Sequence, residues 1–315
     1  MKVSNQIRHI MAIITFLFVT SCSEQQVMTK VIAKPNAVPV FTPDEQKAGG
    51  ELTHKRLYAS YIYPGYGVDN QEKLDFWSGF SFFRDPWVAA PSATGNRDGL
   101  GPLFNTRSCI ACHTAGSRAK LDNAGEILPL SLVVRLGPTD SERNSEEAVD
   151  PIYGGQIQPR ATSYRLTDLK DDNRGEAWLK VDYSIVSGKF DDGESYQLLK
   201  PNYQLSKLAY GELASHIAPS VRLAPNIFGM GLLNAIADKD LLAQEDIDDS
   251  DGDGISAKYN RVPNVLTTPE TGVLQIGRFG FKAKQPNLHQ QVAAAFRDDI
   301  GITNSSFPQD TCTST

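Results

Sequence analysis

The chain has 315 residues, of which 40% are hydrophobic and 22% are charged, a composition typical of a globular protein. A chain of this length can bury a substantial core, as one large domain or two modest ones, without disulfides. The formal net charge is −6 and the sequence has no basic run, so it gives no support to nucleic-acid binding.

The N-terminal residues 1–21 are typical of an export signal. Lys2 and Arg8 flank the start of an apolar stretch that is too short to span a membrane as a helix. The Val-Thr-Ser-Cys sequence that ends at Cys22 resembles the lipobox of bacterial lipoproteins, which implies that Cys22 is lipidated. An ordinary secretory signal with an incidental cysteine is the alternative. We expect an exported protein on the periplasmic side, and Ser23 after the lipidated cysteine implies anchoring in the outer membrane.

Residues 22–42 contain lysines and prolines without a sustained apolar period, as expected for a tether between a membrane surface and a globular body. We assign the globular domain to residues 43–315. Its first element is predicted to be a helix over residues 43–59, which Thr42 can cap. Residues 74–83 are rich in aromatic side chains and should pack into a core or against a large planar ligand.

The middle of the chain, about residues 127–205, is predicted to form strands and loops. Alternating and β-branched residues predict strands at 130–134 and 178–183, and a turn at 191–193 would return residues 195–199 as a hairpin partner. Helical patterns resume at 229–238 and 288–297. These signals indicate a mostly helical and irregular protein with a small β insertion.

Cys109-Ile110-Ala111-Cys112-His113 is a C-x-x-C-H sequence, the attachment signal for c-type haem. Two thiols about one helical turn apart can add to the two vinyl groups on one edge of a porphyrin. The histidine that follows can then coordinate the iron from the same turn. We therefore expect one covalent haem c on Cys109 and Cys112, with His113 as the proximal ligand.

Two other kinds of site use similar residues. A zinc site needs about four ligands, and the mature chain offers only Cys312 and three further histidines, none at paired spacing. A thioredoxin-like redox pair would follow a strand, whereas this motif follows the glycine-rich loop at 98–102. The haem interpretation is favoured over both.

Several stretches extend the pattern beyond the haem motif. They are residues 87–92, 98–109, 153–156, 224–236 and 277–283. In this order they resemble the dihaem oxidoreductase family, a peroxidase-like group related to dihaem cytochrome c peroxidases, and the resemblance covers about residues 76–303. It implies a cytochrome c-like haem domain. Together with the helical patterns, it predicts a mainly α fold with long irregular loops and a small β insertion near 127–205.

The chain departs from that family in one respect. Members carry two haems, the second attached nearer the C-terminus, but no second C-x-x-C-H is found here and Cys312 has no predicted partner. We expect a chain that is truncated at its C-terminus and lacks the second haem region. A natural one-haem variant is the alternative.

Counting the methionines and histidines narrows the candidates for the sixth iron ligand. Outside the signal, the methionines are Met28, in the tether, and Met230. Met230 is flanked by glycines that permit close approach to a flat cofactor, although the same position suits an ordinary core residue. His54, His216, His289 and an open position are the other candidates. These candidates differ in the reduction potential that they would give the haem iron and in whether they leave the iron accessible to peroxide.

An acidic loop begins at Asp249. Asp249, Asp251 and Asp253 alternate as in the opening of an EF-hand-type calcium loop, and Ile255 could add its carbonyl oxygen. Asn260 stands at the twelfth position, where a bidentate glutamate is usual. A calcium site and a solvated acidic turn therefore both fit this loop, and the resemblance to dihaem peroxidases implies calcium.

These patterns predict an exported, membrane-tethered haem c oxidoreductase that exchanges electrons with a redox partner protein. By resemblance, this chain would carry the electron-entry haem, and a second haem would activate peroxide or another oxidant. A non-catalytic monohaem electron carrier is the first alternative. A calcium-stabilised interaction lipoprotein without haem is the second.

Overall fold

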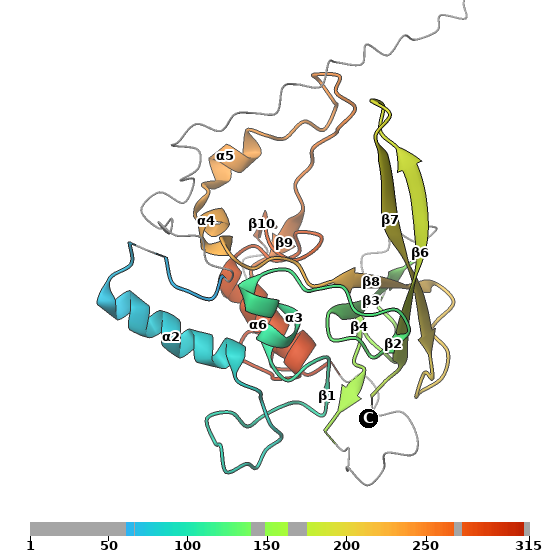
Figure 1. Cartoon of the computed structure of the whole chain (residues 1–315). Coiled ribbons are helices and arrows are strands. Elements are labelled where there is room, and N and C mark those ends of the chain that lie inside the picture. Colours follow the sequence, from blue (N-terminus) through green and yellow to red (C-terminus); the bar gives the residue numbers. More distant parts are fainter. Residues whose placement is uncertain (1–60, 66, 140–148, 163–174, 268–272, 312–315) are drawn as a thin grey trace, which may run out of the picture. The chain divides into compact units, whose positions relative to one another are not determined.

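The computed structural model in Figure 1 describes residues 61–65, 67–139, 149–162, 175–267 and 273–311. Four N-terminal predictions lie outside the described residues: the signal at 1–21, lipidation of Cys22, the tether at 22–42 and the helix at 43–59. Within the described ranges, no helix is long and apolar enough to cross a membrane.

The expected mainly α, cytochrome c-like fold is wrong. The described helices are α2 (Asn70–Arg84), α3 (Cys109–Cys112), the 3-10 turn η3 (Thr114–Gly116), α4 (Met230–Ala235), α5 (Asp238–Leu242) and α6 (Leu288–Ile300). The described strands are β1 (Leu103–Phe104), β2 (Glu126–Ile127), β3 (Leu132–Pro138), β4 (Gln156–Ile157), β5 (Arg160–Ala161), β6 (Trp178–Lys189), β7 (Ser195–Ser206), β8 (Ile217–Leu223), β9 (Arg261–Pro263) and β10 (Leu274–Ile276). Antiparallel sheets and irregular chain therefore dominate this part of the protein.

Short helices explain part of the error. The helix predicted at 229–238 forms as two pieces, α4 and α5, because Ile236 adopts an extended conformation with ψ 128° and ends α4. The helix predicted at 288–297 is confirmed as α6. Asn287 caps it by accepting a hydrogen bond from the Gln290 backbone at 2.8 Å, and Gly301 ends it with φ 73°.

A three-stranded antiparallel sheet forms the best-packed part of the structure. β3 lies between β4 and β8, with Leu132 opposite Leu223 and Pro138 opposite Ile217. The strand predicted at 130–134 is thus confirmed in a longer form. The core cluster on this sheet includes residues from β6 as well. Its fully buried members are Tyr153, Ile157, Ala177 and Val181.

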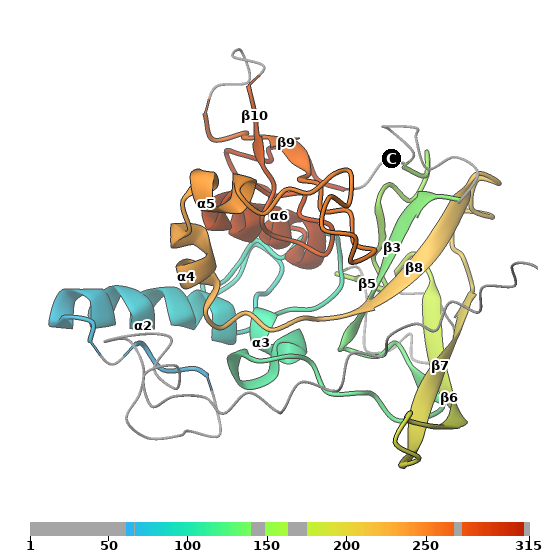
Figure 2. The same cartoon turned by 90° about the horizontal axis from the view of Figure 1, so that it is seen from above.

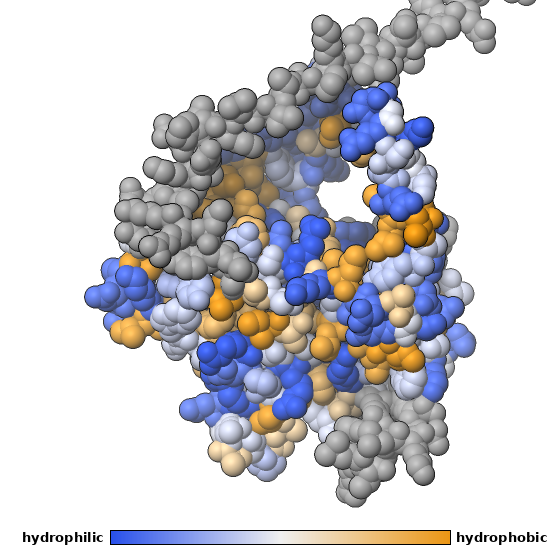
Figure 3. Space-filling model, viewed as in Figure 1, coloured by the Kyte–Doolittle hydropathy of each residue, from blue (hydrophilic) through white to orange (hydrophobic). Residues whose placement is uncertain are grey.

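A long hairpin extends the second sheet, in the order β2-β6-β7. Trp178 pairs with Ser206 at its base and Lys189 with Ser195 at its tip, so the predicted hairpin is confirmed and is longer than expected. Its base is buried at Leu179 and Val181. Hydrophobic side chains are exposed farther out, at Ile185, Val186, Leu198 and Leu199. Figure 3 shows hydrophobic surface on this hairpin.

The helix α2 contains the aromatic-rich stretch at residues 74–83. Asp69 and Glu72 form a capping box at its start, and it ends at Arg84, with Asp85 as its C-cap just before Pro86. Despite its five aromatic residues, α2 has no buried residue. Figures 1 and 2 both place its C-terminal end beside α3, the helix of the haem motif.

Candidate haem site

The one-turn helix α3 holds both cysteines of the C-x-x-C-H motif. Cys109 is half-buried, Cys112 is buried, and neither forms a disulfide. The Cys112 thiol lies 2.6 Å from the Leu130 carbonyl oxygen and donates to it. Burial raises the pKa of each thiol to about 12, so both are neutral. This pair has the spacing and the free thiols that covalent haem attachment requires.

His113 follows at the C-terminal end of α3. Its Nδ1 lies 2.8 Å from the Pro225 carbonyl oxygen, and because a carbonyl only accepts, Nδ1 carries the proton and donates it. Burial lowers the pKa of His113, against the opposing effect of this hydrogen bond, which favours the neutral imidazole. Nε2 is then unprotonated. Histidines that ligate metals are commonly held in this way, with the second nitrogen bound to a carbonyl.

Three further contacts hold the segment before α4, and two of them join it to the segment after the motif. The Ala119 backbone donates to the Ala224 carbonyl at 3.1 Å, and the Ser117 hydroxyl donates to the Asn226 side chain at 3.3 Å. The Tyr61 ring stacks on Phe228 with centroids 3.9 Å apart. The structure thus places residues 113–119, which follow the stretch at 98–109 in the chain, against the stretch at 224–236.

The predicted sixth ligands fall in different surroundings. Met230 is half-buried at the first position of α4, on the segment that contacts the haem motif. His216 faces Asp150 in the sheet region, His289 lies on α6, and His54 is outside the described residues. Ligation by Met230 stays a prediction.

Apolar side chains around the motif are incompletely covered. The Phe83 ring lies 6.4 Å from the His113 ring. Phe83 is half-buried, and Leu232 and Leu233 on α4, whose preceding segment contacts the motif, are both 46% exposed. Neither helix has a buried residue. A porphyrin is a large planar apolar group, so the residues around the motif fit a haem in both chemistry and surface.

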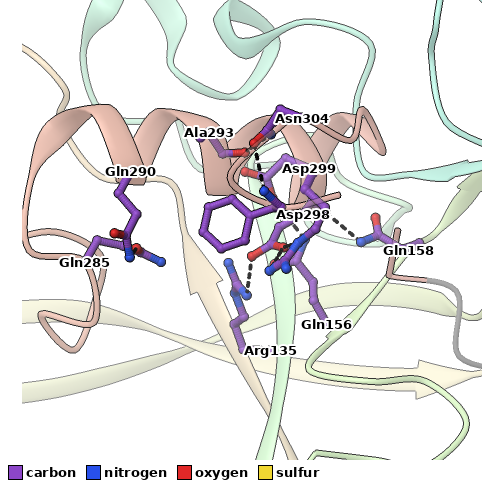
Figure 4. A network of polar contacts seen from close by, with 11 residues as sticks. Arg135, Gln156, Gln158, Gln285, Gln290, Ala293, Asp298, Asp299 and Asn304 are labelled. Carbon is purple, nitrogen blue, oxygen red and sulfur yellow. Dashed lines mark hydrogen bonds and ion pairs between the residues drawn. The ribbon is translucent and has the colours of Figure 1, made fainter. Parts of the chain in front are cut away.

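A network of polar side chains fixes the loop before the motif, and Figure 4 shows it between α6 and the sheet. Gln156 Nε2 donates to the Asp298 carbonyl and to the Asp299 carboxylate, both at 2.9 Å. Gln158 Nε2 also donates to the Asp298 carbonyl, at 2.6 Å. The Asn105 side chain donates to Gln158 at 2.6 Å, and its backbone donates to the Asp299 carbonyl at 2.9 Å.

Asp299 is a site residue that the sequence patterns did not identify. Burial raises its pKa, against the opposing effect of Arg135. Its charge acts on Cys109, Cys112 and His113, so this carboxyl group lies close to the haem motif. The only sequence signal was the position of 298–303 within the stretch covered by the family resemblance.

Arg278, from the stretch at 277–283, makes contacts that the sequence patterns did not indicate. Its guanidinium donates to the carbonyls of Leu233 and Ile236 at the end of α4, at 3.2 and 2.5 Å, and pairs with Asp238 at the start of α5. Cations stabilise helix C-termini. Arg278 therefore holds the short helix that begins with Met230.

In the acidic loop, the carboxylates that lie close together are not the ones predicted from the sequence. Carboxylate oxygens of Asp246, Asp249 and Asp251 lie within 4.8 Å of one another, and Asp253 is not in this group. The Asp253 carboxylate instead accepts a hydrogen bond from the Ile255 backbone at 2.7 Å. Calcium binding stays a prediction, with Asp246 as the neighbour that the alternate spacing did not indicate.

Comparison with known proteins supplies the family. No curated protein and no solved structure matches the chain. The model of the family described as "Di-haem oxidoreductase, putative peroxidase" matches residues 148–315. The matched region begins after the C-x-x-C-H motif and includes the stretches at 153–156, 224–236 and 277–283. The chain belongs to the di-haem oxidoreductase family.

Proposed function

We propose that this protein is an exported haem c oxidoreductase and that Cys109, Cys112 and His113 hold its electron-entry haem. The observation that carries the proposal is the hydrogen bond from His113 Nδ1 to the Pro225 carbonyl. It orients the imidazole and leaves Nε2 for a metal, next to two free thiols at haem-attachment spacing. Family membership supports haem as the cofactor and oxidoreduction as the chemistry.

The haem, when bound, supplies an iron that accepts and passes on single electrons. The chain's own residues attach and orient it. Cys109 and Cys112 provide the two anchoring thiols, and the Pro225 carbonyl keeps the proton on Nδ1 of His113. The polar network around Asp299 fixes the loop that precedes the motif, and the Cys112 side chain is buried against the Leu130 carbonyl.

Covalent attachment is tested by producing the protein in a bacterial periplasm with a haem c maturation system. The wild type should retain haem through denaturation and give the pyridine haemochrome spectrum of a c-type haem. Cys109→Ala and Cys112→Ala should each weaken attachment, and the double variant should abolish it. Cys312→Ser is the matched cysteine control and should keep the haem. Wild-type protein without covalent haem would overturn the proposal.

Ligation is tested in the same material. His113→Ala should keep the thioether bonds but change the Soret and charge-transfer bands, because the proximal ligand is lost. Met230 is our proposed sixth ligand, supported by the contacts that join its segment to the haem motif. Met230→Leu should remove the absorption near the red end of the ferric spectrum that reports Fe–S bonding. An unchanged spectrum would exclude Met230 as a ligand.

Export and anchoring rest on the sequence. We propose that Cys22 is lipidated and holds the protein at the outer membrane, where a redox partner protein supplies electrons. Labelling with a radioactive fatty acid should mark the wild type and leave Cys22→Ser unlabelled. Equal labelling of both proteins would contradict this assignment.

A further inference from the structure

The aromatic residues of α2 form a continuous series of rings that leads away from His113. The Phe83 ring lies 6.4 Å from His113, Phe80 lies 6.0 Å from Phe83, and Trp77 lies 5.8 Å from Phe80. The Tyr63 ring extends the series, 6.3 Å from Trp77. These centroid distances are within the range of direct aromatic contact.

The series follows from helix geometry and runs from half-buried to exposed rings. Trp77, Phe80 and Phe83 recur at spacings of three residues, so each ring lies next to the following one along α2. Phe80 and Phe83 are half-buried, whereas Trp77 and Tyr63 are 43% and 45% exposed. Figure 2 shows α2 extending away from α3 in the same direction.

Not every aromatic residue of α2 belongs to this series. Phe82 stacks on Trp87 at 6.0 Å, and the Arg97 guanidinium lies 4.3 Å above its ring. Phe82 therefore packs against the loop that follows the helix. This difference gives a matched control, because Phe82 is on the same helix and is 40% exposed, but its ring stacks on Trp87 and not on a ring of the series.

We propose that Trp77 is the surface point at which a one-electron donor protein delivers electrons to the haem, and that Phe80 and Phe83 couple it to His113. This inference rests on the proposed function. The donor loses one electron and is oxidised, and the ferric iron gains that electron and becomes ferrous. The aromatic rings mediate the transfer and are unchanged by it, and no proton moves.

Charge around Trp77 indicates the kind of donor. Leu74 is 65% exposed beside it, and the same half of α2 carries the exposed carboxylates Glu72 and Asp75, together with Asp69 at the cap. Lys73 is the one basic residue between them. These three carboxylates, here called the acidic rim, outnumber Lys73 but lie on other sides of α2 than Trp77. Their net negative charge fits a donor with a basic surface, since such complementarity speeds encounter.

The path is tested by flash photolysis of the haem-loaded protein. A ruthenium polypyridyl label is attached at Leu74→Cys, in a background with Cys22→Ser and Cys312→Ser, and haem reduction is followed optically after the flash. Trp77→Leu and Phe80→Leu should each slow intramolecular reduction several-fold, whereas Phe82→Leu should leave the rate unchanged. Phe80→Tyr keeps an aromatic ring and should keep the rate.

The reduction potential and the absorption spectrum of each variant separate coupling from packing. Slower transfer at an unchanged potential and spectrum supports the path. Equal rates in all variants, or equal slowing by Phe82→Leu, would overturn it. Failure of the proposed function is distinguishable, because the protein would then carry no covalent haem and give no optical signal.

The acidic rim is tested with hexaammineruthenium(II), a small cationic electron donor. Asp75→Asn should slow reduction by this donor at low ionic strength, and the difference should vanish at high salt because exposed charges are screened. Asp191→Asn, on the turn between β6 and β7, is the matched charge control and should not slow reduction. Equal rates for Asp75→Asn and wild type at low salt would contradict the rim's role.

Discussion

The sheet region and the helices around the haem motif differ in how completely they bury their apolar side chains. The cluster on β3, β4, β6 and β8 includes Tyr153 and Ile157 at 1% exposure and Val181 at 0%. By contrast, α2 and α4 have no buried residue, although both are rich in large apolar side chains. The sheet region closes its own core, and the helices do not.

This difference indicates where a bound haem contributes stability. Each large apolar side chain that becomes buried contributes about 1.5–3 kcal/mol to the free energy of unfolding. The large apolar side chains of α2 and α4 are not buried by the rest of the polypeptide, so they lack most of this contribution. Their ties to the rest are mainly short polar contacts, such as Arg278 at the end of α4. A bound haem would cover the apolar side chains that face it, so folding of these helices and haem attachment should be coupled.

The largest expected effect is the loss of the helices when the haem cannot attach. In the Cys109→Ser/Cys112→Ser variant, backbone amides of α2 and α4 should exchange hydrogen almost as fast as in an unfolded segment, because few buried contacts hold them. Amides of β3 and the base of β6 should stay protected. Hydrogen exchange with mass spectrometry checks this, and Cys312→Ser serves as the control. Equal loss of hydrogen-exchange protection in the sheet and in α2 and α4 would contradict the proposal that only the helices depend on the haem.

A smaller effect concerns pH and lies in the sheet region alone. Burial raises the pKa of Glu176 to about 7, and its carboxylate accepts a hydrogen bond from the Gln158 backbone at 2.6 Å. The folded state therefore holds this proton more tightly than the unfolded state. Its contribution is fully present below the ordinary glutamate pKa and is lost as the pH rises to about 7, by at most about 3 kcal/mol.

Glu176→Gln tests this pH dependence, because the amide oxygen can still accept from Gln158. Denaturant unfolding from pH 4 to pH 8 should show the variant gaining stability relative to the wild type as the pH rises, and then a constant difference above about pH 7. The haem spectrum should be the same in both proteins. A stability difference independent of pH would show that Glu176 is ionised in the folded state.

Local signals were predictable from the sequence, and contacts between distant segments were not. The C-x-x-C-H motif, the hairpin and α6 depend on residues close together in the chain, and all were identified. The carbonyl that orients His113 belongs to Pro225, 112 positions away. The network of Asn105, Gln158 and Asp299 likewise joins three separate segments, and no local pattern indicates such a meeting.

The wrong fold class has a related cause. Helical periodicity at 229–238 was real but lasted only two short turns on either side of Ile236. The strand signal at 178–183 understated β6, because beyond Tyr183 the strand is held by pairing with β7 rather than by burial. Pairing partners are absent from a local pattern, so the sequence overstated the helices and understated the sheets.

The smallest effect is expected in the sheet region, at the hydroxyl group of Tyr153. The Tyr153 hydroxyl donates to the Gly211 carbonyl at 2.7 Å and accepts from the Tyr210 backbone at 2.8 Å. Tyr153→Phe removes both bonds and leaves these backbone groups without that partner, which should cost about 1–3 kcal/mol of unfolding free energy. Tyr203→Phe, at a position that is 39% exposed, should cost much less.

Urea denaturation of the haem-loaded proteins measures both free energies, and hydrogen exchange locates the change. Tyr153→Phe should lower protection in β3 and β8 while α2 and the haem spectrum keep their wild-type behaviour, because the sheet core does not depend on the haem. Equal loss of protection in α2 would instead mean that the two regions unfold as one cooperative unit. The packed sheet would then be the support on which the haem-binding helices depend.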